Sequence, residues 1–123
     1  MSKKLIYVIP FVLVLGFYLA SSAQAQSIVW CSEDLDVDND DIVDDWEWIE
    51  LLESVGYTVY SEPGIWAVLD DEHIDILNSA DLVIFSRGSN SSGYNQEGEP
   101  EQWNAVAAPM ILMNAYITRN TRW

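Results

Sequence analysis

Residues 81–85, DLVIF, are apolar from Leu82 to Phe85. This pattern is typical of a strand that is buried on both faces, because a half-exposed strand alternates apolar with polar residues. Three other short runs share the apolar, β-branched or aromatic character of strands: 27–31 (SIVWC), 57–60 (YTVY) and 109–116 (PMILMNAY). Strands of this kind need helices on both faces of their sheet, so the sequence predicts an α/β domain.

Segments with the apolar spacing of helices separate the four predicted strands. They cover residues 45–55, 70–79 and 100–106. In the first of them, we expect Trp48, Leu52 and Val55 to be buried against the sheet. The alternation of strands and helices predicts an open three-layer sandwich with one parallel sheet, right-handed crossovers and the flavodoxin-like strand order 2-1-3-4.

The first 25 residues have the pattern of an export signal. Lys3 and Lys4 precede an apolar run from residue 5 to residue 20, and Ala23-Gln24-Ala25 resembles a cleavage site. A retained membrane anchor is the alternative, although the run is short for a membrane span. We therefore expect an exported protein, periplasmic, attached to the cell surface or secreted, whose residues 26–123 form a single α/β domain.

The expected mature chain is strongly acidic. The whole sequence has 20 Asp and Glu against 5 Lys and Arg, a formal net charge of −15. Both lysines lie in the N-terminal segment, so residues 26–123 keep three arginines against all 20 acids, a formal charge of −17. Such a surface repels nucleic acid and anionic membranes. It favours cations, or a salty medium that screens the repulsion.

Three stretches carry a resemblance to a known family: LLESVGYTV (51–59), LNSADLVIFSRGSNSSGY (77–94) and EPEQWNAVAAPMILMNAY (99–116). They resemble the N-terminal part of class I glutamine amidotransferase-like domains, in particular secreted domains of the trehalose-utilisation (ThuA-like) group. Such domains have a further helix and strand, so the resemblance implies a domain truncated at its C-terminus and, as partners, further domains of a longer protein. Apolar surface should then be exposed beside the fourth strand.

A catalytic centre is not predicted. Catalytic members of that superfamily place a nucleophilic cysteine on a tight Gly-x-Cys-x-Gly turn, whereas the comparable strand end here reads MNAYITR (113–119). Cys31 is the only cysteine and follows an apolar run, so we expect a small buried side chain. His73 is the only histidine and is expected to be an exposed helix residue. These residues do not assemble an acyl-transfer triad.

The loop at residues 86–99 is the candidate ligand site. In open α/β sheets, ligands bind outside the carboxyl ends of the strands at the switch point, here between strands 1 and 3. The predicted ligand-binding residues are polar groups or glycines at these strand ends: Ser32, Glu33, Arg87, Gly88, Ser89, Asn90 and Asn114. Such a set suits a sugar or another polar ligand, with Tyr94 available to stack on it. The alternative is a solvated connection in which Arg87 pairs with Glu33 or a nearby Asp.

Residues 36–47, DVDNDDIVDDWE, have the spacing of a calcium loop. The oxygen ligands would come from Asp36, Asp38, Asp40, the Ile42 carbonyl, Asp44 and Glu47. Asp41 stands at the sixth position, where the backbone is left-handed and glycine is usual. The alternative is an acid-rich connection in which Asp44 and Asp45 cap the following helix. The sequence suggests no cofactor other than this calcium ion.

The sequence thus favours an exported, non-catalytic α/β domain that binds a polar or sugar-like ligand or supports a larger surface protein. One alternative is an acidic interaction module stabilised by calcium. The other is the N-terminal piece of an amidotransferase-like or hydrolase-like enzyme whose catalytic half is missing.

Overall fold

The computed structural model describes residues 26–33, 36 and 39–119. Its strands form one parallel sheet in the order β2-β1-β3-β4: β1 (Ser27–Cys31), β2 (Thr58–Ser61), β3 (Leu82–Phe85) and β4 (Met110–Leu112). Its α-helices in the described range are α2 (Trp46–Ser54), α3 (Asp71–Ser79) and α4 (Glu99–Asn104). The predicted α/β fold and strand order are confirmed. The predicted export signal, residues 1–25, lies outside the described residues.

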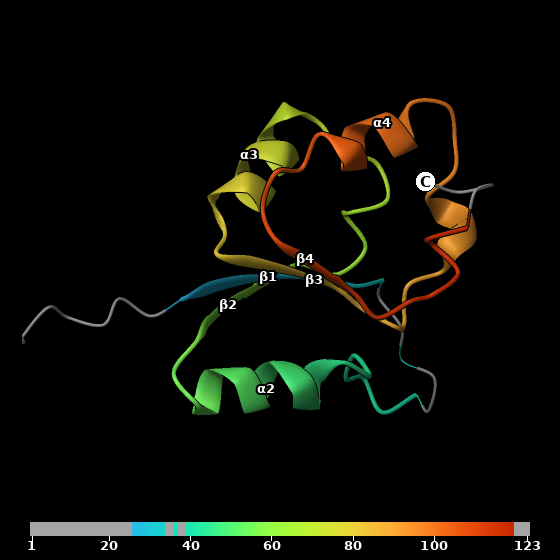
Figure 1. Cartoon of the computed structure of the whole chain (residues 1–123). Helices are drawn as coiled ribbons and strands as arrows, with labels where there is room; N and C mark the ends of the chain where they lie inside the picture. Colours follow the sequence, from blue (N-terminus) through green and yellow to red (C-terminus); the bar gives the residue numbers. More distant parts are fainter. Residues whose placement is uncertain (1–25, 34–35, 37–38, 120–123) are drawn as a thin grey trace, which may run out of the picture.

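The sheet separates two layers of helices (Figure 1), with α3 and α4 on one face and α2 on the other. The core beneath α3 and α4 is the larger one, and it includes Val29, Val83, Phe85, Trp66 and Trp103. The smaller core beneath α2 consists of Ile28, Trp30, Ile49 and Ile84. Neighbouring residues of β1 and β3 therefore enter opposite cores, which is why these strands are apolar throughout.

The prediction for the buried face of α2 was wrong in part. Trp48 and Val55 are 53% and 66% exposed, whereas Ile49 is 5% exposed and Leu52 is half-buried. Helical spacing identifies an apolar stripe, but it does not say which side of the stripe faces the sheet. Here α2 contacts the sheet through Ile49 and Leu52 at the edge of that stripe.

Helix α3 begins after Asp70, which is its N-cap. The Asp70 side chain accepts a hydrogen bond from the backbone N–H of His73 at 2.9 Å, and the His73 side chain accepts one from the backbone N–H of Asp70. His73 is half-buried, with its ring centroid 5.8 Å from that of Trp66. The prediction of an exposed helix histidine was therefore wrong, because the ring closes the capping box and packs on the core.

The fourth strand is shorter than predicted. β4 spans only Met110–Leu112, and the chain turns after Met113. Ile111 and Met113 are 49% and 40% exposed, and Tyr116 is 57% exposed. Apolar surface is thus exposed beside β4, as expected for an edge strand that α2 does not cover.

Candidate ligand-binding site

The carboxyl ends of β1 and β3 lie side by side at the centre of the sheet. Cys31 is paired with Phe85, and the N–H of Ser86 donates to the carbonyl of Cys31 at 2.8 Å. From this point the chain leaves β1 towards β2 on one side, while β3 connects to β4 on the other. The predicted switch point is therefore bordered by Ser32 and Ser86, the residues that follow the two strands.

A carboxylate joins the two strand ends from below. Oδ2 of Asp45 accepts a hydrogen bond from Trp30 Nε1 at 3.2 Å and a short one from Ser86 Oγ. Ser86 Oγ in turn accepts from the N–H of Gly88 at 2.9 Å. Asp45 precedes α2 but makes no side-chain cap, because its carboxylate is directed to β1 and β3. Asp45 thus holds the N-cap position as expected, but the expected side-chain cap is absent, and the part of Asp45 in this site was not predicted.

Glu33 and Asn90, both predicted ligand residues, are in direct contact. Glu33 Oε1 accepts from the N–H of Asn90 at 2.8 Å. Asn90 Oδ1 accepts from the backbone N–H and the hydroxyl of Ser92. Asn90 is thereby the N-cap of the 3-10 helix η1 (Ser91–Gly93). A side chain at Gly93 would meet Glu33 Oε1 at 3.7 Å. The loop is therefore folded onto the end of β1 rather than extended into solvent.

Ser89 and Asn114 also come together, from the ends of β3 and β4. Asn114 Nδ2 donates to the carbonyl of Ser89 at 2.5 Å, and Asn114 Oδ1 accepts from the N–H of Tyr116 at 3.0 Å. Both side chains are buried. Of the seven predicted ligand residues, only Arg87 and Asn90 are exposed. Arg87 does not pair with Glu33 within the described part of the chain, where Glu33 Oε1 instead accepts from the N–H of Asn90.

A buried hydroxyl without a partner marks this edge of the sheet. Ser32 is 1% exposed, and its Oγ makes no hydrogen bond to any described residue. Ser89 Oγ is also buried and makes no hydrogen bond that meets the usual distance and angle limits. It lies near enough to the Tyr94 phenol to lower its pKa. A buried polar group left unpaired costs about 1–3 kcal/mol, so native proteins rarely keep one without a use.

Two residues with reactive or stacking side chains lie in the core instead. Tyr94 is 1% exposed and packs on Phe85 with ring centroids 4.8 Å apart, so the expectation that Tyr94 stacks on a ligand was wrong. Burial raises the pKa of the Tyr94 phenol above its ordinary range, while the Ser89 hydroxyl lowers it. Burial also raises the pKa of the Cys31 thiol far above its ordinary range, which keeps it protonated and unreactive.

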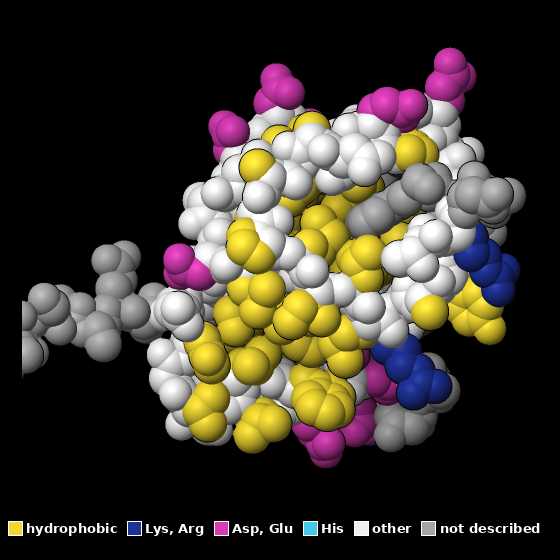
Figure 2. Space-filling view, in the orientation of Figure 1, with side chains coloured by type: hydrophobic (Ala, Val, Ile, Leu, Met, Phe, Trp, Pro, Cys, Tyr) yellow, Lys and Arg dark blue, Asp and Glu magenta, His cyan; other side chains and the backbone are white. Residues whose placement is uncertain are grey.

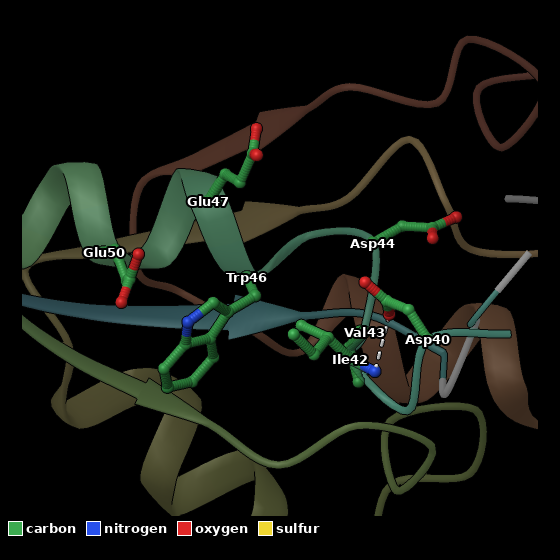
Figure 3. Close-up of a pocket in the computed structure, with 7 residues that line it drawn as sticks. All are labelled: Asp40, Ile42, Val43, Asp44, Trp46, Glu47 and Glu50. Atoms are coloured by element: carbon green, nitrogen blue, oxygen red, sulfur yellow. Dashed lines mark hydrogen bonds between the residues drawn. The ribbon is translucent and has the colours of Figure 1, made fainter. Parts of the chain in front are cut away.

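The acidic loop, residues 36–47, leads into α2 and includes Asp45 of the network described above. A depression of about 460 Å³ is lined there by acids and apolar side chains (Figure 3): Asp40, Ile42, Val43, Asp44, Trp46, Glu47 and Glu50. The Asp36 carboxylate accepts from the N–H groups of Asp40 and Asp41, both at 3.0 Å. Asp41 has φ 66°, the left-handed conformation expected at the sixth position of a calcium loop.

The predicted calcium ligands are not gathered. In Figure 3 the side chains of Asp44 and Glu47 point in different directions. Among the described residues, no three acids, cysteines or histidines are placed to hold a metal ion, and Asp38 lies outside the described range. The calcium site therefore stays a prediction: the backbone bend of the loop agrees with it, whereas the side chains of Asp44 and Glu47 do not converge.

Comparison of the chain with protein-family models, curated proteins and solved structures gives no match. The resemblance to the glutamine amidotransferase-like superfamily therefore stays a prediction, and the fold class rests on the sheet topology. Within residues 26–33, 36 and 39–119, no helix has the length and hydrophobicity that a membrane span requires.

Proposed function

We propose that this chain is an exported, non-catalytic α/β domain that binds a neutral, hydroxyl-rich ligand such as a sugar at the carboxyl edge of β1, β3 and β4. The observation that carries the proposal is the buried hydroxyl of Ser32 beside the switch point, which has no hydrogen-bond partner among the described residues. A hydroxyl both donates and accepts, so a hydroxylated ligand is a matched partner for it. Arg87 and Asn90 are exposed on the loop that follows β3, and they supply further polar groups.

The charge of the molecule favours a neutral ligand. The formal net charge of −15 repels anions, and Arg87 is the one cation on the loop. The absence of a catalytic role is supported by the two residues best suited to one: the Cys31 thiol is buried, and His73 closes the cap of α3. Neither Cys31 nor His73 is therefore available as a nucleophile or base at this edge of the sheet.

The test compares two serine-to-alanine variants. Chemical shifts of the backbone amides at Ser32, Ser89 and Asn90 should move when glucose, maltose or glycerol is titrated into the wild type. Ser32→Ala should lose this response. Ser79→Ala, which changes an exposed position of α3, should keep it. Removal of a buried unpaired hydroxyl should leave the free energy of unfolding unchanged or raise it by about 1 kcal/mol.

Two outcomes contradict the proposal. The first is that none of the three probes shifts the amides of the wild type. The second is that Ser32→Ala binds the same probe as tightly as Ser79→Ala does. A gain of stability together with a loss of binding is the combination expected of a residue kept for its function.

A second candidate function is that of a calcium-stabilised interaction module. It is favoured by the left-handed backbone at Asp41 and by the three N–H groups that Asp36 and Asp40 bind. An acidic loop bent in this way resembles the start of a calcium loop. Calcium binding would need Asp44 and Glu47 to turn towards Asp36.

A further inference from the structure

The two faces of the sheet are covered unequally. Strands of a parallel sheet are normally covered by helices on both faces. Among the helices of the described residues, α3 and α4 lie over one face and α2 lies over the other (Figure 1), where it packs on β1, β2 and Ile84 of β3. Ile84 of β3 still packs on Ile49 of α2, whereas the lower face of β4 has no helix against it within the described part of the chain, and Ile111 is 49% exposed there.

A groove of about 400 Å³ runs along this uncovered face. Its floor is apolar and comes from β1, β3 and β4, with Leu52 of α2 as a wall: Ile28, Leu82, Ile84, Ile111 and Leu52, with Asp81 at one end. Figure 2 shows hydrophobic side chains gathered over this part of the molecule, between β4 and α2, with acidic side chains below them.

The wall formed by α2 extends the apolar surface. Trp48, Leu51, Leu52 and Val55 follow the spacing i, i+3, i+4, i+7, which places them along one side of a helix. Leu52 lines the groove, so the other three lie on the same side of α2. Trp48 is 53% exposed, Leu51 is 54% exposed and Val55 is 66% exposed. Large side chains exposed together in this way are typical of a docking surface.

Architecture and charge identify the occupant. The unit that ordinarily covers such a face is a helix with an apolar stripe. Helix α2 carries Glu47, Glu50 and Glu53 and no basic residue, and the chain has a formal charge of −15. A second copy of the chain would be repelled by this charge, whereas a helix with lysines and arginines beside its apolar stripe would be attracted. We propose that the groove binds a cationic amphipathic helix of a partner protein.

The test uses the peptide LKKLLKLLKKLLKL, an amphipathic helix with lysines on its polar face, and measures its binding by calorimetry. Ile111→Asp changes the floor of the groove, and Leu51→Asp changes the exposed apolar side of α2 beside it. Val68→Asp is the matched control, because Val68 is 61% exposed outside the groove and the substitution adds the same charge. We expect both groove variants to bind at least about tenfold more weakly than the wild type, as for central interface residues, and the control to bind like the wild type.

A second peptide, LEELLELLEELLEL, separates charge from apolar contact and should bind much more weakly than the lysine peptide. Circular dichroism of each variant checks that the fold is retained, and two variants on different elements guard against a local folding defect. Equal binding by the groove variants and by Val68→Asp would overturn the proposal, since general attraction to an acidic protein would then suffice. A dimer in solution that Ile111→Asp dissociates would also overturn it, because a second copy would then occupy the groove.

Discussion

At the scale of single residues, one carboxylate organises the lower side of the sheet. Asp45 Oδ2 binds Trp30 Nε1 from β1 and Ser86 Oγ from the end of β3. Trp30 is 2% exposed and Ser86 is completely buried, so neither donor reaches water if Asp45 is lost. A buried donor without an acceptor is more costly than the net gain from an ordinary hydrogen bond.

Asp45→Ala should therefore lower the free energy of unfolding by about 2 kcal/mol, the cost of leaving buried donors unpaired. Asp45→Asn keeps one side-chain oxygen and should be destabilised less. Glu50→Ala, at an exposed position of α2, is the control and should stay within about 0.5 kcal/mol of the wild type. Urea unfolding measures all three. A loss in Asp45→Ala no larger than that in Glu50→Ala would show that the network does not hold α2 in place.

At the scale of elements, α3 is the helix whose start is best defined. Its capping box joins the Asp70 carboxylate to the N–H of His73. The hydrogen bond from that N–H is the main cause that holds the pKa of Asp70 below its ordinary value of 3.8. The electrostatic attraction between the carboxylate and His73 is a smaller cause. The folded state therefore prefers the ionised carboxylate. Its contribution is complete above the ordinary pKa and is lost as the pH falls through the lowered one.

Asp70→Ala should lower the melting temperature by roughly a few degrees at neutral pH, because the cap of α3 is lost. The difference from the wild type should shrink as the pH falls below the ordinary value of 3.8 and through the lowered pKa of the folded state, where the wild-type carboxylate becomes protonated. Asp75→Ala, an exposed position on the same helix, serves as the control. Melting curves at several pH values measure the effect. A difference between the wild type and Asp70→Ala that does not change with pH would contradict the role of the ionised cap.

At the scale of the whole molecule, charge is the dominant property. The described residues contain Arg87 and Arg119 but no lysine, and Arg119 lies over the ring of Tyr116 at 4.1 Å from its centroid. The acids far outnumber these cations, so their mutual repulsion opposes the compact state. Salt in general reduces this repulsion by screening. A calcium ion would reduce it at one place, the loop that begins at Asp36.

Millimolar calcium should raise the melting temperature more than sodium does at matched ionic strength. If the loop binds calcium only when folded, the gain is about 2.7 kcal/mol at a hundredfold excess over the dissociation constant. Asp36→Asn combined with Glu47→Gln should abolish the calcium-specific part and leave the response to sodium. Equal responses of the wild type to the two salts would leave the loop as an acidic connection that is only screened.

Much of the fold could be predicted, but less of the site. The predicted ligand residues Glu33 and Asn90 are hydrogen-bonded to each other, and Ser89 is hydrogen-bonded to Asn114. These contacts form because the strand order places the ends of β1, β3 and β4 side by side. Burial could not be predicted for most of these residues, since it depends on how the loop folds back. The part of Ser86 in the hydrogen-bond network at the strand ends was not predicted either. The available signal was a buried Trp30, whose indole N–H needs an acceptor from elsewhere in the chain.

The sequence by itself determined the strands, the helices between them and therefore the parallel sheet, because continuous apolar runs and helical spacing are local properties of the chain. Only the tertiary structure decided which side of α2 is buried and where Asp45 and Tyr94 lie. Asp45 and Ser86 are 41 residues apart, and Tyr94 reaches the core through contacts with Phe85 and Trp103. Such contacts depend on the folded chain as a whole, so no local pattern predicts them.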